Sequence, residues 1–279
     1  MLTPPDLAAY LERIGYDGPV RPTREVLAAL QLAHVQAIPF ETFESLTGRR
    51  PALDLPSLLN KLVRSRRGGY CFEHNRLFEA ALRSFGFRPI GLLGRVLLGQ
   101  AEDAETARTH MLLRVEVEGE DLITDVGFGG QVLTGPIRLE SGLVQATPHE
   151  PYRLDESGGV WSLRAEVAGE WRLLYRFTLE PALAIDYEVG NHYVATHPAS
   201  FFAQALVGAR ILPGSRLTLL GHRITEHRMG EPSRAEEFED DRALRAALTD
   251  RFGIEVEDSM WRAALDRIGP TPGSQSPSS

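Results

Sequence analysis

The chain has 279 residues, of which 43% are hydrophobic and 24% are charged, a composition typical of globular proteins and unlike that of disordered chains. Thirty Lys and Arg residues against 38 Asp and Glu residues leave a net charge of −8. We therefore expect no broad nucleic-acid surface, although a local basic pocket for one phosphorylated ligand is compatible with this balance. The length suits one elaborated unit or two to three packed subdomains.

The cysteine count and the lack of a signal-peptide or membrane-segment pattern narrow the class of protein further. Cys71 is the single cysteine, so no intramolecular disulfide or cysteine-based zinc cluster can form, and we expect no metal. The N-terminal segment lacks the pattern of a signal peptide, and no apolar run approaches about 18 residues. These features predict a cytoplasmic protein without a membrane segment. Lys61 is the single lysine, which we interpret as compositional bias without functional meaning.

Residues 1–86 predict a small bundle of short helices. Apolar residues recur at helical spacing, with Thr and Asp caps or Pro at the starts and Gly or Pro at the ends. The expected helices occupy residues 4–15, 23–38, 54–68 and 71–86.

From Phe87 onward the pattern changes to β-branched and aromatic segments that predict strands. Glycine turns at Glu118-Gly119 and Ala168-Gly169 separate neighbouring segments and predict hairpins. Residues 87–195 should therefore form an antiparallel sheet or barrel. The expected strands occupy residues 90–98, 111–117, 122–126, 160–167 and 171–179.

The pattern after Pro198 is mixed. Residues 201–207 suit either a strand or a short helix, and the final segment 269–279 is rich in Pro and Ser and predicts disorder. The remaining segments predict a hairpin at 215–221 and 222–225 and helices at 235–252 and 260–268.

The segment Arg67–Asn75, RGGYCFEHN, places Cys71 at the start of a predicted helix after two glycines. Unpaired N–H groups and the helix dipole at this position favour a thiolate. The same N–H groups are suited to receive an oxyanion from an attacked carbonyl. The alternative is a small buried structural cysteine, and the residues alone leave both interpretations open.

A nucleophilic cysteine needs a base and a group that orients the base. If Glu118 and Gly119 form a two-residue hairpin loop, His110 faces Gly127 across the ladder. Asp125 is then a diagonal neighbour of His110 on the same face, within about 7 Å. A register shift of one residue would place the two side chains on opposite faces. His110 alone could be an ordinary strand-end histidine, but a carboxylate in an apolar strand requires a partner.

The cysteine segment closely resembles the active-site motif of arylamine N-acetyltransferases. Three further segments match that family in order, and a fifth match is looser. The resemblance spans about residues 7–202 and departs from the family at Thr42-Phe43, where Asn-Leu often follows the motif. The matching segments are 38–41 (IPFE), 109–113 (THMLL), 125–129 (DVGFG) and 191–202, which contains NHY and THPASFF.

The resemblance implies an α+β fold with a cysteine-protease-like triad of Cys71, His110 and Asp125. Its parts would be an N-terminal helical bundle (1–86), a central antiparallel β-barrel (87–195) and a C-terminal α/β lid (196–268). The implied reaction is ping-pong: the cysteine takes the acetyl group of acetyl-CoA, the co-substrate, and passes it to an arylamine, hydrazine or arylhydroxylamine.

The resemblance also implies positions around the triad. Glu41 and Arg67 are interpreted as an ion pair that holds the cysteine loop, and Glu73 and His74 as structural residues. The implied acceptor and acyl pocket is lined by Phe40, Phe128 and Phe202. The implied CoA entrance lies near Thr109, Gly127 and Gly129.

Three other functions remain open at this point. Water in place of the amine would make a thioesterase or cysteine hydrolase, and a tethered amine would make an amide synthase. A catalytically dead binding module is disfavoured because the residues of the implied triad are all present. The sequence leaves undecided the physiological acceptor, the acyl-chain preference, the CoA contacts of the C-terminal third and the oligomeric state.

Overall fold

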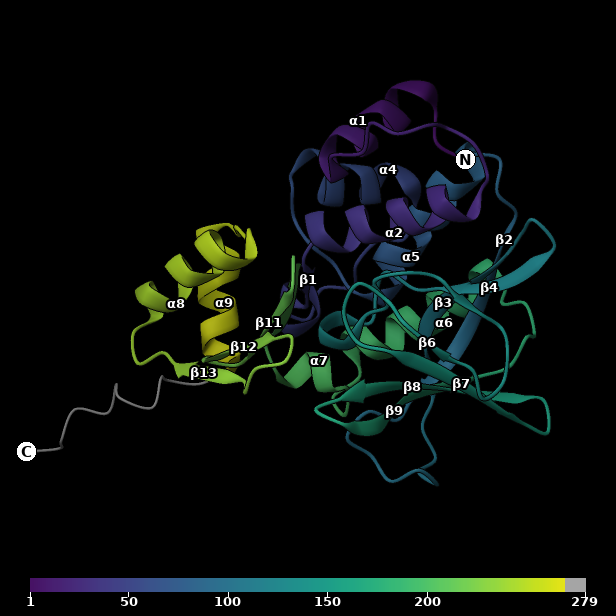
Figure 1. The fold of residues 1–279 in the computed structure, drawn as a ribbon. Coiled ribbons are helices and arrows are strands. Elements are labelled where there is room, and N and C mark those ends of the chain that lie inside the picture. Colours follow the sequence, from purple (N-terminus) through teal and green to yellow (C-terminus); the bar gives the residue numbers. More distant parts are fainter. Residues whose placement is uncertain (269–279) are drawn as a thin grey trace, which may run out of the picture.

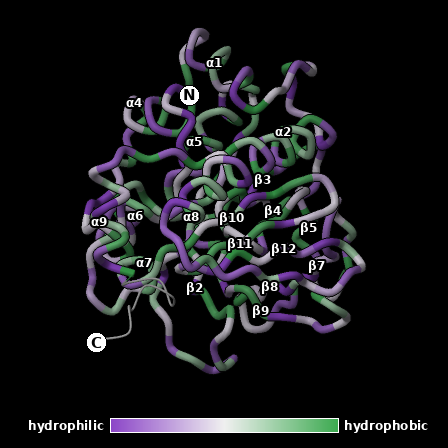
Figure 2. The backbone as a smooth tube through the Cα atoms, turned by 90° about the vertical axis from the view of Figure 1, so that its left-hand side faces the viewer, coloured by the Kyte–Doolittle hydropathy of each residue, from purple (hydrophilic) through white to green (hydrophobic). Residues whose placement is uncertain are grey.

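The computed structural model describes residues 1–268 and divides into helices at one end, a large antiparallel sheet, and a smaller sheet with its own helices (Figure 1). The predicted disordered tail, residues 269–279, lies outside the described residues. Within residues 1–268, no helix combines the length and apolar character needed to cross a bilayer. Hydropathy alternates along single helices and strands (Figure 2), as expected where each element buries one face.

The four predicted N-terminal helices are present. Thr23 and Asp54 cap two of them by accepting hydrogen bonds from backbone N–H groups three residues later. The third helix continues as a π-helical turn and ends at Arg64, earlier than the predicted stop at Gly68. The elements are α1 Pro4–Ile14, α2 Arg24–Ala37, α3 Phe43–Leu46, α4 Leu55–Leu58, η1 Leu59–Arg64 and α5 Cys71–Ser84.

The central sheet has eight antiparallel strands in the order β5-β4-β3-β2-β9-β8-β7-β6. Its two edge strands approach each other: the Gln145 side chain of β6 exchanges two hydrogen bonds with the Arg138 backbone of β5, so the barrel is nearly closed. The strands are β2 Pro89–Val96, β3 Arg108–Val117, β4 Glu120–Thr124, β5 Ile137–Arg138, β6 Val144–Gln145, β7 Tyr152–Ser157, β8 Val160–Val167 and β9 Glu170–Phe177.

The register of the β3–β4 hairpin agrees with the prediction. Leu113 pairs with Thr124, and Val117 pairs with Glu120, which leaves residues 118 and 119 as the loop. Both loop residues have positive φ, 54° and 80°, as a type I′ turn requires. The turn therefore sets which side chains of the two strands share a face.

One helix in the middle of the chain was not predicted. Helix α6 (Ala184–Thr196) packs on β3, α3 and α7 (Phe201–Gln204). A Cβ on its Gly190 would lie 2.7 Å from the ring of Phe72, so α6 also lies close to α5. Its β-branched and aromatic residues, such as Ile185, Val189 and Tyr193, are equally typical of a strand.

The C-terminal part contains a five-stranded sheet in the order β1-β10-β11-β12-β13. The predicted hairpin at 215–225 is present, and residues 201–207 form a short helix followed by the start of a strand. The elements are β1 Phe40–Glu41, α7 Phe201–Gln204, β10 Val207–Leu212, β11 Ser215–Leu220, β12 Arg223–Arg228, β13 Arg234–Glu237, α8 Asp241–Ala247, η3 Leu248–Phe252 and α9 Asp258–Ile268.

The predicted helix at 235–252 is wrong in its first part. Arg234–Glu237 is a strand, because its residues pair with β12 in a register that joins Thr225 to Ala235. The helix α8 starts only after Asp240, whose side chain caps it. The ladder with β12 outweighs the helical preference of the Ala and Glu residues here.

Candidate active site

Cys71 is the first residue of α5 and lines a cavity of about 610 Å³. Cys71 is 5% exposed to solvent, and its Sγ lies 3.6 Å from the carbonyl oxygen of Thr109. The N–H groups of the first helical turn have no partner within the helix. The sulfur therefore sits between the positive end of a helix and the beginning of strand β3.

His110 and Asp125 form a buried hydrogen-bonded pair beside the sulfur. His110 Nε2 lies 2.7 Å from Asp125 Oδ2, and both residues are almost inaccessible to solvent. The side chain of Cys71 is close enough to the ring to influence its pKa. Burial alone would lower the pKa of His110, but the charge and hydrogen bond of Asp125, together with the sulfur, raise it to about 10. The structure thus favours an imidazolium.

Asp125 accepts hydrogen bonds from three further donors. The Asn75 amide and the Gly127 N–H both lie 2.9 Å from Oδ1, and the Tyr175 hydroxyl lies 3.1 Å from Oδ2. Burial would raise the pKa of Asp125, but His110, Asn75 and the Gly127 N–H hold it below its ordinary value. The carboxylate is therefore ionised and fixed in orientation.

Sequence reasoning assigned no role to Asn75 or Tyr175. Asn75 stands one helical turn after Cys71, so the i, i+4 spacing could have indicated that it shares the face of the cysteine. Tyr175 lies on β9, and no local signal connects it with Asp125. Its position follows only from the order of the strands in the barrel.

Asn75 and Gly127 allow the β3–β4 hairpin to pack closely against the start of helix α5. Asn75 donates to the Met111 carbonyl at 2.8 Å and accepts from the Val126 N–H at 3.2 Å. A Cβ on Gly127 would lie 2.7 Å from the Cα of Cys71, so only glycine permits this approach. The side-chain and backbone contacts together bring the carboxylate, the ring and the sulfur into one place.

The predicted pocket residues surround the same cavity. Phe128 lies edge-on to His110 with ring centroids 5.0 Å apart, and Phe40 and Phe202 lie edge-on to each other at 5.7 Å. Of the predicted site residues, all except the fully buried Asp125 border the cavity: Phe40, Cys71, Thr109, His110, Gly127, Phe128, Gly129 and Phe202.

Charged and imidazole groups hold the loop before Cys71. Arg67 Nη2 lies 2.5 Å from Glu41 Oε1, as expected for the predicted ion pair. His74 Nε2–H donates to the carbonyl oxygens of Pro39 at 3.2 Å and Gly69 at 3.1 Å. Burial lowers the pKa of His74 to about 4, so this ring is neutral at physiological pH. Glu41, Arg67 and His74 do not border the cavity.

A helical bundle, a near-closed barrel and a buried Cys–His–Asp arrangement at an apolar cavity are the features of an enzyme with a cysteine nucleophile. A family model described as N-acetyltransferase matches residues 23–261. The arylamine N-acetyltransferase of Mycolicibacterium smegmatis is 46% identical over 268 residues, covering 94% of this chain and 97% of the relative. The chain belongs to the arylamine N-acetyltransferase family and is an N-acetyltransferase.

Two other relatives add detail. A Salmonella typhimurium protein, named arylamine N-acetyltransferase / N-hydroxyarylamine O-acetyltransferase, is 42% identical over 253 residues, covering 90% of each chain. The structure of Mycobacterium marinum arylamine N-acetyltransferase in complex with CoA is 40% identical. It superposes with a TM-score of 0.90 and covers 94% of this chain and 99% of that one.

Proposed function

We propose that this enzyme transfers the acetyl group of acetyl-CoA to arylamines, hydrazines and N-hydroxyarylamines through an acetyl-Cys71 intermediate. The observation that carries this proposal is the hydrogen-bonded pair of Asp125 and His110 beside the Cys71 sulfur, at the wall of an aromatic cavity. The name of the Salmonella relative supports O-acetylation of N-hydroxyarylamines as a second outcome of the same site.

In the first half-reaction the Cys71 thiolate attacks the thioester carbonyl. The backbone N–H of Cys71 stabilises the developing oxyanion. The C–S bond to CoA breaks, CoA leaves as a thiolate, and the imidazolium of His110 supplies its proton. The acetyl group is then bound to the enzyme as a thioester.

In the second half-reaction the amine attacks this thioester. His110, now neutral, takes the proton of the attacking nitrogen, and the C–S bond to Cys71 breaks to regenerate the thiolate–imidazolium pair. Asp125 orients the ring and stabilises its charge in both steps. A thioester suits this role because it remains activated toward amines while the covalent intermediate waits for an acceptor.

The walls of the cavity suit both substrates. Phe40, Phe128 and Phe202 offer apolar faces to a flat aromatic acceptor. Thr109, Gly127 and Gly129 provide open backbone at the cavity, and we assign the entrance for the pantetheine arm of CoA to them.

Quenched reactions with acetyl-CoA, followed by intact-protein and peptide mass spectrometry, test the proposal. The wild type should gain one acetyl group on Cys71, and Cys71→Ala should gain none and lose transfer. His110→Ala and Asp125→Asn should slow transfer by several orders of magnitude. Wild-type rates in Cys71→Ala would overturn the mechanism.

An acceptor panel separates this function from its rivals. Release of CoA thiol beyond one equivalent per enzyme should require an arylamine, hydrazine or N-hydroxyarylamine. Continued release in buffer alone would favour a thioesterase, and continued release only with a substrate carrying a tethered amine would favour an amide synthase. A panel of acyl-CoA donors in the same assay gives the acyl preference.

A further inference from the structure

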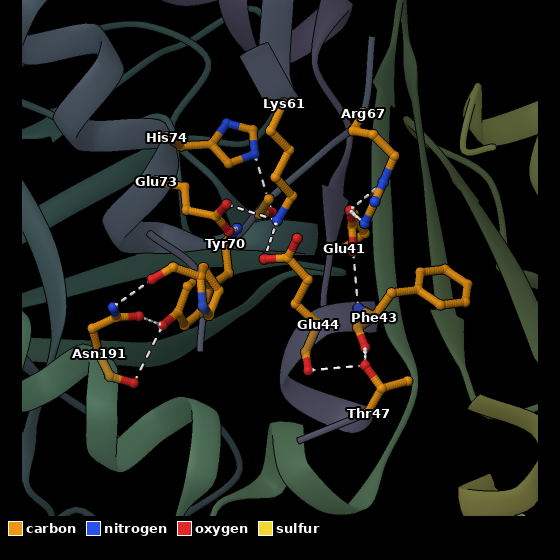
Figure 3. A network of polar contacts seen from close by, with 12 residues as sticks. Glu41, Phe43, Glu44, Thr47, Lys61, Arg67, Tyr70, Glu73, His74 and Asn191 are labelled. Atoms are coloured by element: carbon orange, nitrogen blue, oxygen red, sulfur yellow. Dashed lines mark hydrogen bonds and ion pairs between the residues drawn. The ribbon is translucent and has the colours of Figure 1, made fainter. Parts of the chain in front are cut away.

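Lys61, the single lysine of the chain, reaches between the carboxylates of Glu73 and Glu44 (Figure 3). Its side chain is 13% exposed, and its Nζ lies 2.7 Å from Glu73 Oε1 and 3.0 Å from Glu44 Oε2. A buried ammonium is costly unless such partners compensate for lost water.

Glu73 uses its second oxygen to hold the backbone before the nucleophile. It is the third residue of α5, and its Oε2 accepts the Tyr70 N–H at 3.1 Å. A Cβ on Gly69 would lie 2.7 Å from the same Oε2. The carboxylate therefore packs directly against the peptide units that lead into Cys71, the proposed oxyanion donor.

The charge state of Glu73 depends on its surroundings. Burial raises the pKa of Glu73 to about 7, although Lys61 acts in the opposite direction, and Glu44 and Glu41 raise it further. Without Lys61, the carboxyl group would take up a proton at a higher pH. The charged or titratable groups that face this cluster are Glu41 of β1, Glu44 of α3, Lys61 of η1, Arg67 of the following loop, and Tyr70 and His74 beside Cys71.

We propose that Lys61 and Glu73 are positioning residues for the nucleophile. The ammonium keeps the Glu73 carboxylate ionised, and the ionised carboxylate fixes the Tyr70 peptide so that Cys71 meets His110 and the thioester. Protonation of Glu73 removes its negative charge and weakens the hydrogen bond that it accepts from the Tyr70 N–H. This inference rests on the proposed acetyl-Cys71 reaction and adds a pH-sensitive support to it.

The test measures the first-turnover rate of Cys71 acetylation by acetyl-CoA from pH 5.5 to 9, with quenched intact-protein mass spectrometry. The wild-type rate should fall as the pH drops through about 7. Lys61→Met should shift this acid limb upward by at least one pH unit, so that the rate at pH 7 drops at least about five-fold and recovers by pH 9. Glu73→Gln should remove the limb, because an amide oxygen accepts the Tyr70 N–H without a charge.

The double variant Lys61→Met/Glu73→Gln should regain most of the rate at pH 7, and Lys61→Arg should keep the wild-type profile. Arg76→Met, on the outer side of the same helix, is the matched control and should leave the profile unchanged. A wild-type acid limb in Glu73→Gln would overturn the proposal even if Lys61→Met fails to fold. An equal loss for Lys61→Met at every pH would also overturn it, since a purely structural role predicts that result.

Acetylation on a residue other than Cys71 in the wild type would instead contradict the proposed function. That outcome is visible in the peptide map of the same samples. The failure of the positioning role and the failure of the acetyl-Cys71 mechanism are therefore distinguishable.

Discussion

Asp125 has no access to solvent and nevertheless carries a charge, because four donors surround its two oxygens. An isolated carboxylate at this depth would be protonated. Here the positive charge of His110 balances the carboxylate, and Asn75 and Tyr175 donate further hydrogen bonds to its oxygens. The imidazolium of the resting enzyme therefore depends chiefly on this carboxylate.

Replacing Asp125 by Asn tests this dependence at the level of one residue. The amide carries no charge, so burial is opposed only by the sulfur and the pKa of His110 should fall well below 10. Histidine side-chain NMR against pH would measure the shift. A ring that still titrates near 10 in Asp125→Asn would show that the carboxylate is not its cause. Tyr175→Phe, which removes one donor and keeps the charge, should leave His110 protonated at neutral pH.

At the scale of elements, the site forms where the start of a helix meets the end of a hairpin. Helix α5 supplies the sulfur and Asn75, and the β3–β4 hairpin supplies the ring and the carboxylate. Gly127 lies at the contact, where its missing side chain lets the Cys71 backbone approach. The two elements are thus held by close packing as well as by hydrogen bonds.

Gly127→Ala should separate the two elements. The added Cβ would lie 2.7 Å from the Cα of Cys71 and 3.0 Å from its carbonyl oxygen, and backbone atoms cannot move aside as a flexible side chain would. We expect a loss of at least about 100-fold in first-turnover acetylation, because small displacements in a reacting geometry are costly. Gly135→Ala is the control, since its Cβ would meet Pro148 at an ordinary 3.6 Å. Equal activities in the two variants would contradict this account.

At the scale of the whole molecule, the C-terminal sheet is tied to the barrel by one buried ion pair. Arg216 of β11 pairs with Glu150 and donates to the carbonyl oxygens of Gly130 and Val132, both at 3.1 Å. It therefore also holds the turn that borders the catalytic cavity. The side chains of this pair are 1% and 10% exposed.

Arg216→Met should destabilise the fold by about 3–5 kcal/mol, because it leaves Glu150 buried without a partner. Urea unfolding measures the change. Arg216→Met/Glu150→Gln should recover part of the loss, since the uncompensated charge is gone. Arg234→Met, which breaks an exposed pair with Glu231, should stay within about 0.5 kcal/mol of wild type. A similar loss in Arg216→Met and Arg234→Met would contradict the burial argument.

Much of the local structure is determined by the sequence. Thr23 and Asp54 cap their helices, and the Glu118-Gly119 turn fixes a register that brings His110 and Asp125 to one face. These features depend on residues close together in the chain, where local hydrogen bonds and turn geometry decide the conformation. The motif resemblance adds Cys71 to this pair, which hairpin geometry could not do.

The tertiary structure alone decided the contacts between distant segments. Tyr175 reaches Asp125 because only β2 separates β9 from β3 in the barrel. Arg234–Glu237 becomes a strand because β12 offers an unpaired edge. The sequence alone led us to interpret Lys61 as compositional bias, whereas the fold places it between Glu44 and Glu73. Burial and charge pairing depend on which surfaces meet, and no local pattern of residues contains that information.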